Sequence, residues 1–167
     1  MKKVNYLDIK DNSISEFRHK WALVTARKKD GTFNMCTISW GSIGELWSRP
    51  VVTVYIKPIR HTDSFLVEDD YFTVTFFNDD HKSDLAFCGT KSGRDYDKVK
   101  ETNLTPIILE NGITFEGFRR VYVCKKIYAQ RFEKDCFVDS QDIIDRYYED
   151  EPCHNFYVGK IIDVFEQ

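Results

Sequence analysis

The sequence predicts a mainly β fold, a small Greek-key barrel with a few short helices. Several segments alternate their side chains with the period of two that is typical of strands. Turn-forming residues separate many of these segments, as they do in small antiparallel barrels. Strand and helix patterns do not alternate regularly along the chain, which disfavours a parallel α/β sheet.

The first two expected strands form a hairpin. They cover residues 19–27 (HKWALVTAR) and residues 32–40 (TFNMCTISW). The polar turn Lys28–Gly31 separates them. Two strand-like runs joined by a short turn that contains glycine predict a β-hairpin.

Four further strands are expected, at residues 51–57, 71–77, 119–130 and 155–165. Residues 51–57 carry apolar or aromatic side chains at most positions, which indicates a strand covered on both faces. Residues 71–77 alternate phenylalanine and valine with threonine, the clearest strand pattern in the chain.

Helices are expected to be short, at residues 62–68, 80–88, 94–101 and 141–148. Thr62 or Asp63 would cap the first of them, since threonine and aspartate favour the N-cap position. Residues 78–80 would cap the second, and Gly89 would stop it. The last has Ile143, Ile144 and Tyr147 on one side.

Length and composition are those of one globular domain over residues 1–167. The 167 residues are 42% hydrophobic, enough to bury a core, and the net charge is −3. Excess negative charge argues against non-specific binding to nucleic acid. No apolar run approaches the ~20 residues that span a bilayer, and no apolar segment of a signal peptide follows the first lysines. We therefore expect neither nucleic-acid nor membrane partners.

The five cysteines lie far apart and form no C-x-x-C pair. This spacing is poor support for a zinc ribbon or a thioredoxin-like centre. Free thiols in a reducing compartment are the simplest interpretation, and it favours the cytoplasm. No H-E-x-x-H or similar histidine–carboxylate spacing occurs, so no metal site is expected.

The segment Asn34–Ser42 contains two hydroxyl groups on one face of a strand. Thr37 and Ser39 lie two residues apart, whereas Cys36 and Ile38 point the other way. Buried hydroxyls need a hydrogen-bond partner. The polar edge of a ligand ring would supply one, and solvent at a strand edge would do so equally well.

The glycines that follow, Gly41 and Gly44, do not form a dinucleotide fingerprint, because the third glycine and the βαβ context are missing. They indicate either a turn beside a ligand or a plain turn between two strands. The residues alone do not decide between these two interpretations.

Two further segments carry charges suited to an anion. Arg60, His61 and Thr62 follow a strand and open a helix, where amides and a guanidinium can hold a phosphate. Residues 91–98 (KSGRDYDK) form either a glycine-turned anion cradle or a solvated charged loop. His154, just before the last strand, either contacts a ligand or a hydride donor or has no such role.

The order and spacing of these motifs resemble those of the flavin reductase-like family, flavoredoxin included. The motifs are N-x-x-T-I-S-W-G from Asn34, L-W-x-x-P from Leu46, P-x-R-x-T from Pro58 and C-G-x-K-S-G-R-D-x-D-K from Cys88. A looser H-x-x-x-x-G match begins at His154. The resemblance implies an FMN-binding split β-barrel that forms a homodimer, with FMN near the subunit interface.

By position, the resemblance also implies roles for individual residues. The isoalloxazine or ribityl chain of FMN would be bordered by Asn34, Thr37, Ser39, Trp40 and Gly41. The phosphate would be bound by Arg60 and Thr62, and the site would be closed by Lys91, Ser92 and Arg94. His154 would lie on the open side, where a nicotinamide could stack. Cys36 and His61 depart from the family pattern, which often has methionine and tyrosine there.

The function that the resemblance implies is an FMN-dependent NAD(P)H oxidoreductase. FMN would receive hydride at its N5 and pass on hydride or electrons, with NAD(P)H as a transient co-substrate. The acceptor would be a small molecule or a protein. One alternative is a flavoredoxin-like electron-transfer protein that does not use NAD(P)H directly. Another is a split-barrel module that binds a ligand without catalysis.

Overall fold

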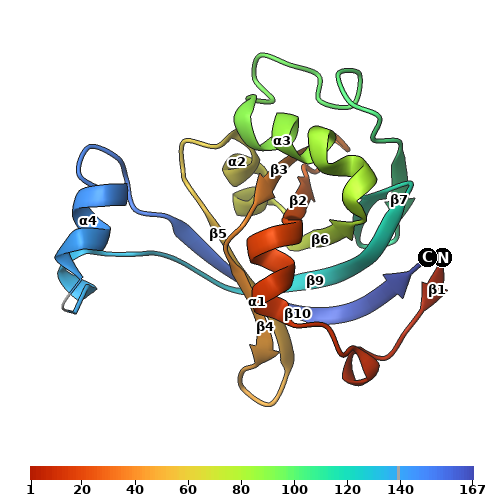
Figure 1. Ribbon diagram of the computed structural model, residues 1–167, viewed down its shortest axis with the longest axis horizontal. Coiled ribbons are helices and arrows are strands. Elements are labelled where there is room, and N and C mark those ends of the chain that lie inside the picture. Colours follow the sequence, from red (N-terminus) through yellow and green to blue (C-terminus); the bar gives the residue numbers. More distant parts are fainter. Residues whose placement is uncertain (139) are drawn as a thin grey trace.

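A single curled antiparallel sheet dominates the computed structural model, which describes residues 1–138 and 140–167 (Figure 1). The strand order is β3-β2-β6-β9-β10-β5-β4, and the short strand β1 pairs with β10. These strands are β1 (Lys2–Lys3), β2 (Ala22–Arg27), β3 (Phe33–Ile38), β4 (Gly41–Glu45), β5 (Pro50–Ile56), β6 (Tyr71–Phe77), β9 (Phe118–Arg131) and β10 (Asn155–Glu166).

The sheet curls into a barrel that stays open along one seam. Its two edges are β3 and β4, and only Ser39 and Trp40 separate these strands in the chain. Within the described ranges, no hydrogen-bonded ladder joins β3 to β4, although β3 passes close to β5. The chain therefore crosses the seam at residues 39–40, which leaves the polar end of β3 uncovered.

All six expected strands are present, with small shifts at their ends. The expected strand 19–27 begins only at Ala22, because the chain before it is helical: α1 (Ser13–Ser15) continues as a π-helical turn, Glu16–Lys20. The Phe17 ring on that turn packs into the barrel core. Strand β4 was not expected, since its sequence GSIGE is rich in glycine; pairing with β5 holds it in place.

A separate hairpin also went unpredicted. It consists of β7 (Pro106–Leu109) and β8 (Gly112–Phe115), and β8 packs against the main sheet. Its strands have only four residues each, too few for a clear alternation in the sequence.

Three of the four expected helices form: α2 (His61–Glu68), α3 (Lys82–Thr90) and α4 (Gln141–Tyr147). The expected capping of α2 by Thr62 or Asp63 is wrong, because Arg60 occupies the N-cap position and both other residues lie inside the helix. A 3-10 turn, Asp79–His81, precedes α3, and α3 continues past Gly89. Residues 94–101 form turns rather than a helix.

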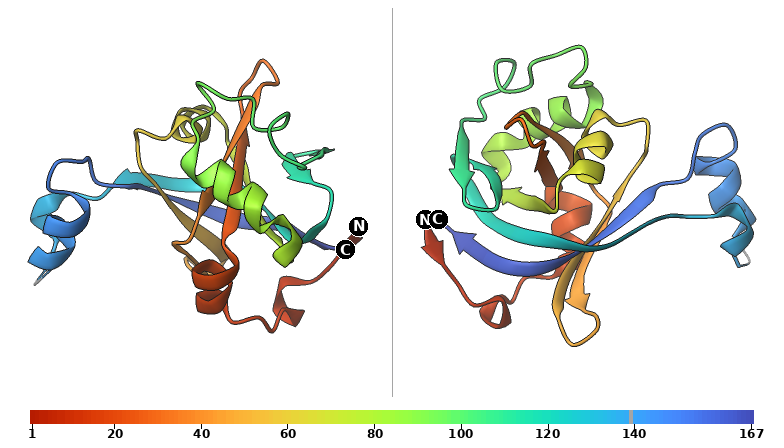
Figure 2. Two further views of the ribbon diagram at one scale, coloured as in Figure 1. Left: turned by 45° about the horizontal axis from the view of Figure 1, so that its top comes forward. Right: turned by 180° about the vertical axis from the view of Figure 1, so that it is seen from behind.

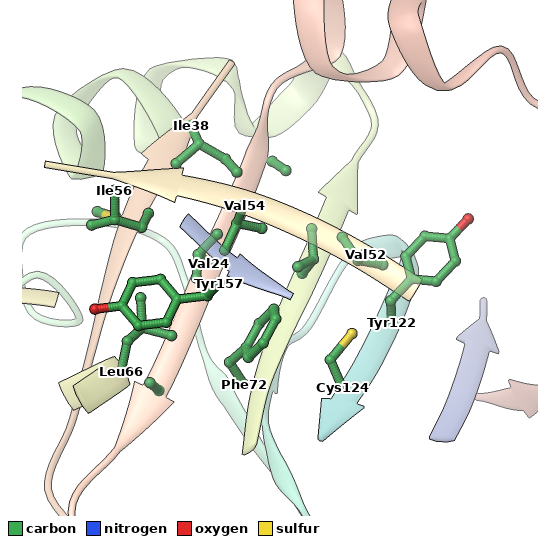
Figure 3. Packing of buried hydrophobic residues seen from close by; sticks show 14 of the residues in the cluster. Val24, Ile38, Val52, Val54, Ile56, Leu66, Phe72, Tyr122, Cys124 and Tyr157 are labelled. Atoms are coloured by element: carbon green, nitrogen blue, oxygen red, sulfur yellow. The ribbon is translucent and has the colours of Figure 1, made fainter. Parts of the chain in front are cut away.

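The barrel core is filled by side chains from the sheet and from α2 (Figure 3). Val54, Phe72, Tyr157 and Leu66 meet there from four different elements. Gly159 on β10 lies against this core, where an added Cβ would come within 2.5 Å of the Phe72 ring. This close packing explains the glycine without any appeal to a ligand. A second apolar cluster lies beneath α3 and the β7–β8 hairpin.

The C-terminal end of β9 and the N-terminal end of β10 extend beyond the barrel and carry a projecting arm, residues 132–138 and 140–154 (Figures 1 and 2). The arm contains a 3-10 turn, Lys134–Cys136, and α4. The two chain ends meet on the opposite side of the molecule, where β1 pairs with β10. In the part of the chain that the structure describes, no helix is both long and apolar enough to cross a bilayer.

Candidate functional site

A cleft of about 630 Å³ opens at the seam where the chain leaves β3. Its walls come from the ends of β3 and β5, the start of α2, the loop after α3, and the arm. All but two of the site residues predicted from the sequence line it. They are Thr37, Ser39, Trp40, Arg60, Thr62, Lys91, Ser92, Arg94 and His154.

The two exceptions, Asn34 and Gly41, lie behind the cleft wall. Asn34 is buried, and its Nδ2 donates a 2.8 Å hydrogen bond to Oγ1 of Thr62. An added Cβ at Gly41 would lie 2.4 Å from the Phe17 ring. Both residues therefore support the site through packing within the protein and do not border the open space.

One end of the cleft is suited to an anion. The Nη1 of Arg60 donates to the Gly89 carbonyl at 2.6 Å, and the Nη1 of Arg94 donates to the Ile59 carbonyl at 3.0 Å. Each guanidinium has five N–H donors, so each is held in place with donors to spare. The amides of His61 and Thr62, which precede the first hydrogen-bonded amide of α2, add to this positive end.

The loop after α3 carries one buried lysine and one exposed lysine. Lys98 is buried, and its Nζ donates to the carbonyls of Met35 at 2.7 Å and Cys88 at 3.0 Å. Burial lowers the pKa of Lys98. Lys91 instead stays exposed at the cleft, 5.4 Å from the centre of the Tyr96 ring. The sequence alone does not show which of the two lysines is buried. Of the two, Lys98 is the one that anchors the loop.

The hydroxyl groups at the end of β3 also differ from each other. Thr37 Oγ1 donates a 2.6 Å hydrogen bond to the Leu85 carbonyl, so this hydroxyl ties β3 to α3. Ser39 is exposed in the cleft. Cys36 and Ile38 are buried on the core side, as the strand alternation predicted. Ser39 is therefore the hydroxyl that is free to meet a ligand.

Aromatic side chains from the arm and from the link between β3 and β4 pack together along the cleft. The Trp40 ring lies 5.1 Å from the ring of Tyr147 and 5.1 Å from that of His154, measured between centroids. An ion pair between Lys57 and Glu151 joins the end of β5 to the arm. The sequence predicts Tyr147 on an amphipathic helix, but nothing in it indicates that this helix lies beside the cleft.

The histidines of the cleft are less basic than free imidazole. Burial, reinforced by the positive charges of Lys57 and Arg60, lowers the pKa of His154 to about 4. Burial and the Arg94 charge lower the pKa of His61, whose ring packs edge-on against Phe65. Both side chains are therefore neutral at pH 7, and the fixed positive charge of the cleft comes from its arginines and lysines.

This donor set fits a ligand with a phosphate at one end and a flat polar ring at the other. The volume lies within the roughly 300–1,000 Å³ of small-molecule sites. Guanidinium groups and helix amides suit the phosphate, while Ser39 and Trp40 offer a hydroxyl and an aromatic face to the ring. The residues present thus fit FMN. Across the described ranges, no group of three histidine, cysteine or carboxylate side chains is placed to hold a metal ion.

Comparison with known proteins agrees with this geometry. Residues 14–166 match the family model described as "Flavin reductase like domain". No curated protein matches the chain.

Several solved structures share the fold. The FMN-binding protein of Thermus thermophilus with bound p-hydroxybenzaldehyde superposes with a TM-score of 0.70 at 20% identity, covering 100% of this chain and 82% of that one. Flavoredoxin from Methanosarcina acetivorans gives a TM-score of 0.69 at 19% identity, with 89% and 68% covered. A putative flavin reductase with a split barrel domain from Shewanella frigidimarina gives a TM-score of 0.68 at 19% identity. The match covers 89% of this chain and 67% of that one. These likenesses confirm the predicted split-barrel fold.

Proposed function

Because the chain belongs to the flavin reductase-like family, a family of flavoproteins, we propose that it binds FMN in the cleft and works as an NAD(P)H-dependent oxidoreductase. One observation carries the proposal. Four segments far apart in the sequence bring cations, a free hydroxyl group and aromatic rings together around a single cleft. A surface with no ligand would not need this combination.

The phosphate end is the better defined half. Arg60 and Arg94 would bind the phosphate through charge-assisted hydrogen bonds, helped by the first amides of α2. Thr62 sits in the first turn of that helix, and its hydroxyl accepts from Asn34. Lys91 and Ser92 would close this end of the cleft from the loop after α3.

The ring end would be shaped by Ser39, Trp40 and His154. When bound, FMN supplies hydride and electron transfer at its N5. The task of the protein is then to orient the ring, to limit water and to leave one face open. Ser39 would hydrogen-bond the polar ring edge, and NAD(P)H would bind transiently on the side of His154. The electron acceptor would be a small molecule or a second protein.

We also propose that the chain forms a homodimer. A row of neighbouring aromatic rings runs from Trp47 in the β4–β5 turn to Tyr55, which also lines the cleft; Tyr128, Phe156 and Phe132 lie between them. Trp47 is 61% exposed and Tyr128 is 39% exposed, while the other three rings are half-buried. Large exposed apolar patches are uncommon on monomers. Light scattering after gel filtration is expected to give twice the chain mass, and a mass of one chain would contradict the dimer.

An absorbance spectrum tests the proposed activity. The protein reconstituted with FMN should be yellow, and anaerobic NADH or NADPH should bleach it. Bound FMN that neither nucleotide reduces would overturn the reductase assignment. That result would favour the electron-transfer role suggested by the likeness to flavoredoxin. Folded protein that takes up no flavin would point instead to a binding module for another ligand.

A further inference from the structure

Tyr148 and His154 form a buried pair at the arm side of the cleft. The Tyr148 hydroxyl lies 3.0 Å from Nδ1 of His154. Only 4% of Tyr148 and 8% of His154 are exposed. A buried hydrogen bond of this kind holds both rings in one orientation, because breaking it would leave polar atoms without partners. The arm thus delivers Tyr148 to a residue that faces the cleft.

The chemistry of the two groups gives the direction of this bond. A phenol O–H is a strong donor and its oxygen is a weak acceptor, because its lone pairs are partly delocalised into the ring, whereas a neutral imidazole has a strongly accepting nitrogen. Burial raises the pKa of Tyr148, which keeps the proton on the phenol oxygen. That proton is therefore available to Nδ1 of His154.

A neutral imidazole has one donor and one acceptor nitrogen. If Nδ1 accepts from Tyr148, the ring proton is on Nε2. Among the described residues, Nε2 of His154 has no hydrogen-bond partner, while the ring itself lines the cleft beside Trp40. The nitrogen that carries the proton is therefore the one left for a ligand.

We propose that Tyr148 is a positioning residue that fixes the Nε2–H tautomer of His154, so that this imidazole donates a hydrogen bond to a carbonyl or carboxamide oxygen of the molecule that exchanges hydride with the flavin. The inference rests on the proposed function. A neutral donor suits a neutral oxygen, whereas the anionic group belongs at the arginine end.

The surroundings of Tyr148 support a fixed position. Its ring packs 5.7 Å from that of Phe137 within the arm. The ion pair between Lys57 and Glu151 fastens the following turn to β5. Phe132 N donates to the His154 carbonyl at 3.0 Å, which continues the pairing of β9 with β10 as far as His154.

Nuclear magnetic resonance of protein with ¹⁵N-labelled histidine tests the tautomer directly, without FMN. At pH 7 we expect the Nε2–H form for His154 in the wild type and a mixture of tautomers in Tyr148→Phe. Tyr147→Phe, which loses a neighbouring hydroxyl that does not bond His154, should keep the wild-type signal. An Nδ1–H or doubly protonated wild-type ring would overturn the proposal, as would an unchanged tautomer in Tyr148→Phe.

Stopped-flow reduction of the FMN-loaded protein tests the consequence. Loss of one neutral hydrogen bond, about 1 kcal/mol, should slow reduction by NAD(P)H in Tyr148→Phe by about 5–10-fold, with FMN affinity retained. An unchanged rate despite the lost tautomer would refute the positioning role. If neither nucleotide reduces the wild type, the proposed reductase activity fails, and the tautomer measurement still decides whether Tyr148 positions His154.

Discussion

The side-chain amide of Asn34 donates a 2.8 Å hydrogen bond to the hydroxyl of Thr62, and this buried bond joins β3 to the first turn of α2. The Oδ1 of the same amide is so close to Gly93 that an added Cβ there would lie 2.2 Å away. Three parts of the cleft therefore meet at one amide that does not itself line the cleft. The position of the arginines at the phosphate end depends on this junction.

Gly93→Ala should weaken FMN binding and lower stability. The new methyl group cannot share space with Asn34, so the loop that carries Arg94 must shift. Overpacking of this kind typically costs 1–3 kcal/mol. Gly44→Ala is the matched control, because nothing lies within 4 Å of an added Cβ there. FMN titration and thermal denaturation give the two readouts. Equal FMN affinity and equal thermal stability in the two variants would contradict the role of this junction.

Thr37, on β3, and Ser39, just after the strand, should separate stability from binding. Thr37→Val removes the hydrogen bond to the Leu85 carbonyl and should cost about 1 kcal/mol of unfolding free energy. Ser39→Ala should leave stability nearly unchanged and weaken FMN binding. Urea denaturation and fluorescence titration measure the two effects. Reversed results would mean that the hydroxyl roles are exchanged.

Arg60→Ala and Arg94→Ala should each weaken FMN binding. A hydrogen bond to a charged group is worth about 1.5–3 kcal/mol, or roughly a 10- to 150-fold change in dissociation constant. Arg49→Ala, an exposed arginine in the β4–β5 turn, is the control and should bind FMN normally. Since both cleft arginines also hold backbone carbonyls, circular dichroism must first show that the variants are folded. Wild-type affinity in both would remove them from the phosphate site.

The burial of His154 should make the protein less stable in acid. The unfolded chain binds a proton at this residue near pH 6.5, whereas the folded protein does so only near pH 4. Stability therefore falls as the pH drops through this window, by up to about 3 kcal/mol. The His154→Gln variant should not show this decrease in the free energy of unfolding between pH 6.5 and pH 4. His61 changes in the same direction but is present in both proteins, so the difference between their urea-denaturation curves isolates His154. Parallel curves from pH 7 to pH 4 would contradict the assignment.

Much of the fold could be predicted because its strands carry strong local patterns. The period of two in β6 gave that strand its observed bounds, residues 71–77. Strand β4 and the β7–β8 hairpin could not be predicted, because glycine content or short length hides their alternation. The first expected strand, residues 19–27, begins too early, because nothing in residues 16–20 signals a π-helical turn.

The residues that line the cleft could be predicted wherever they stand in fixed motifs, as Arg60 and Arg94 do. Three features of the site could not be predicted from the sequence. Lys98 sits in a charged run yet is buried, because two backbone carbonyls accept from its ammonium group. Asn34, which was expected to border the flavin, is buried and hydrogen-bonds Thr62 behind the cleft wall. Tyr148 reaches His154 only through the return of the arm, an arrangement that depends on contacts far apart in the sequence.

The central claim is that the cleft holds FMN by its phosphate, between Arg60 and Arg94. Titration of flavin-free protein with FMN and, separately, with riboflavin tests it most directly, because riboflavin has the same ring and ribityl chain but no phosphate. We predict that FMN binds the wild type more tightly than riboflavin, and that Arg60→Ala removes most of that difference. Equal affinity for the two flavins in the wild type, or no binding of either to the folded protein, would contradict it.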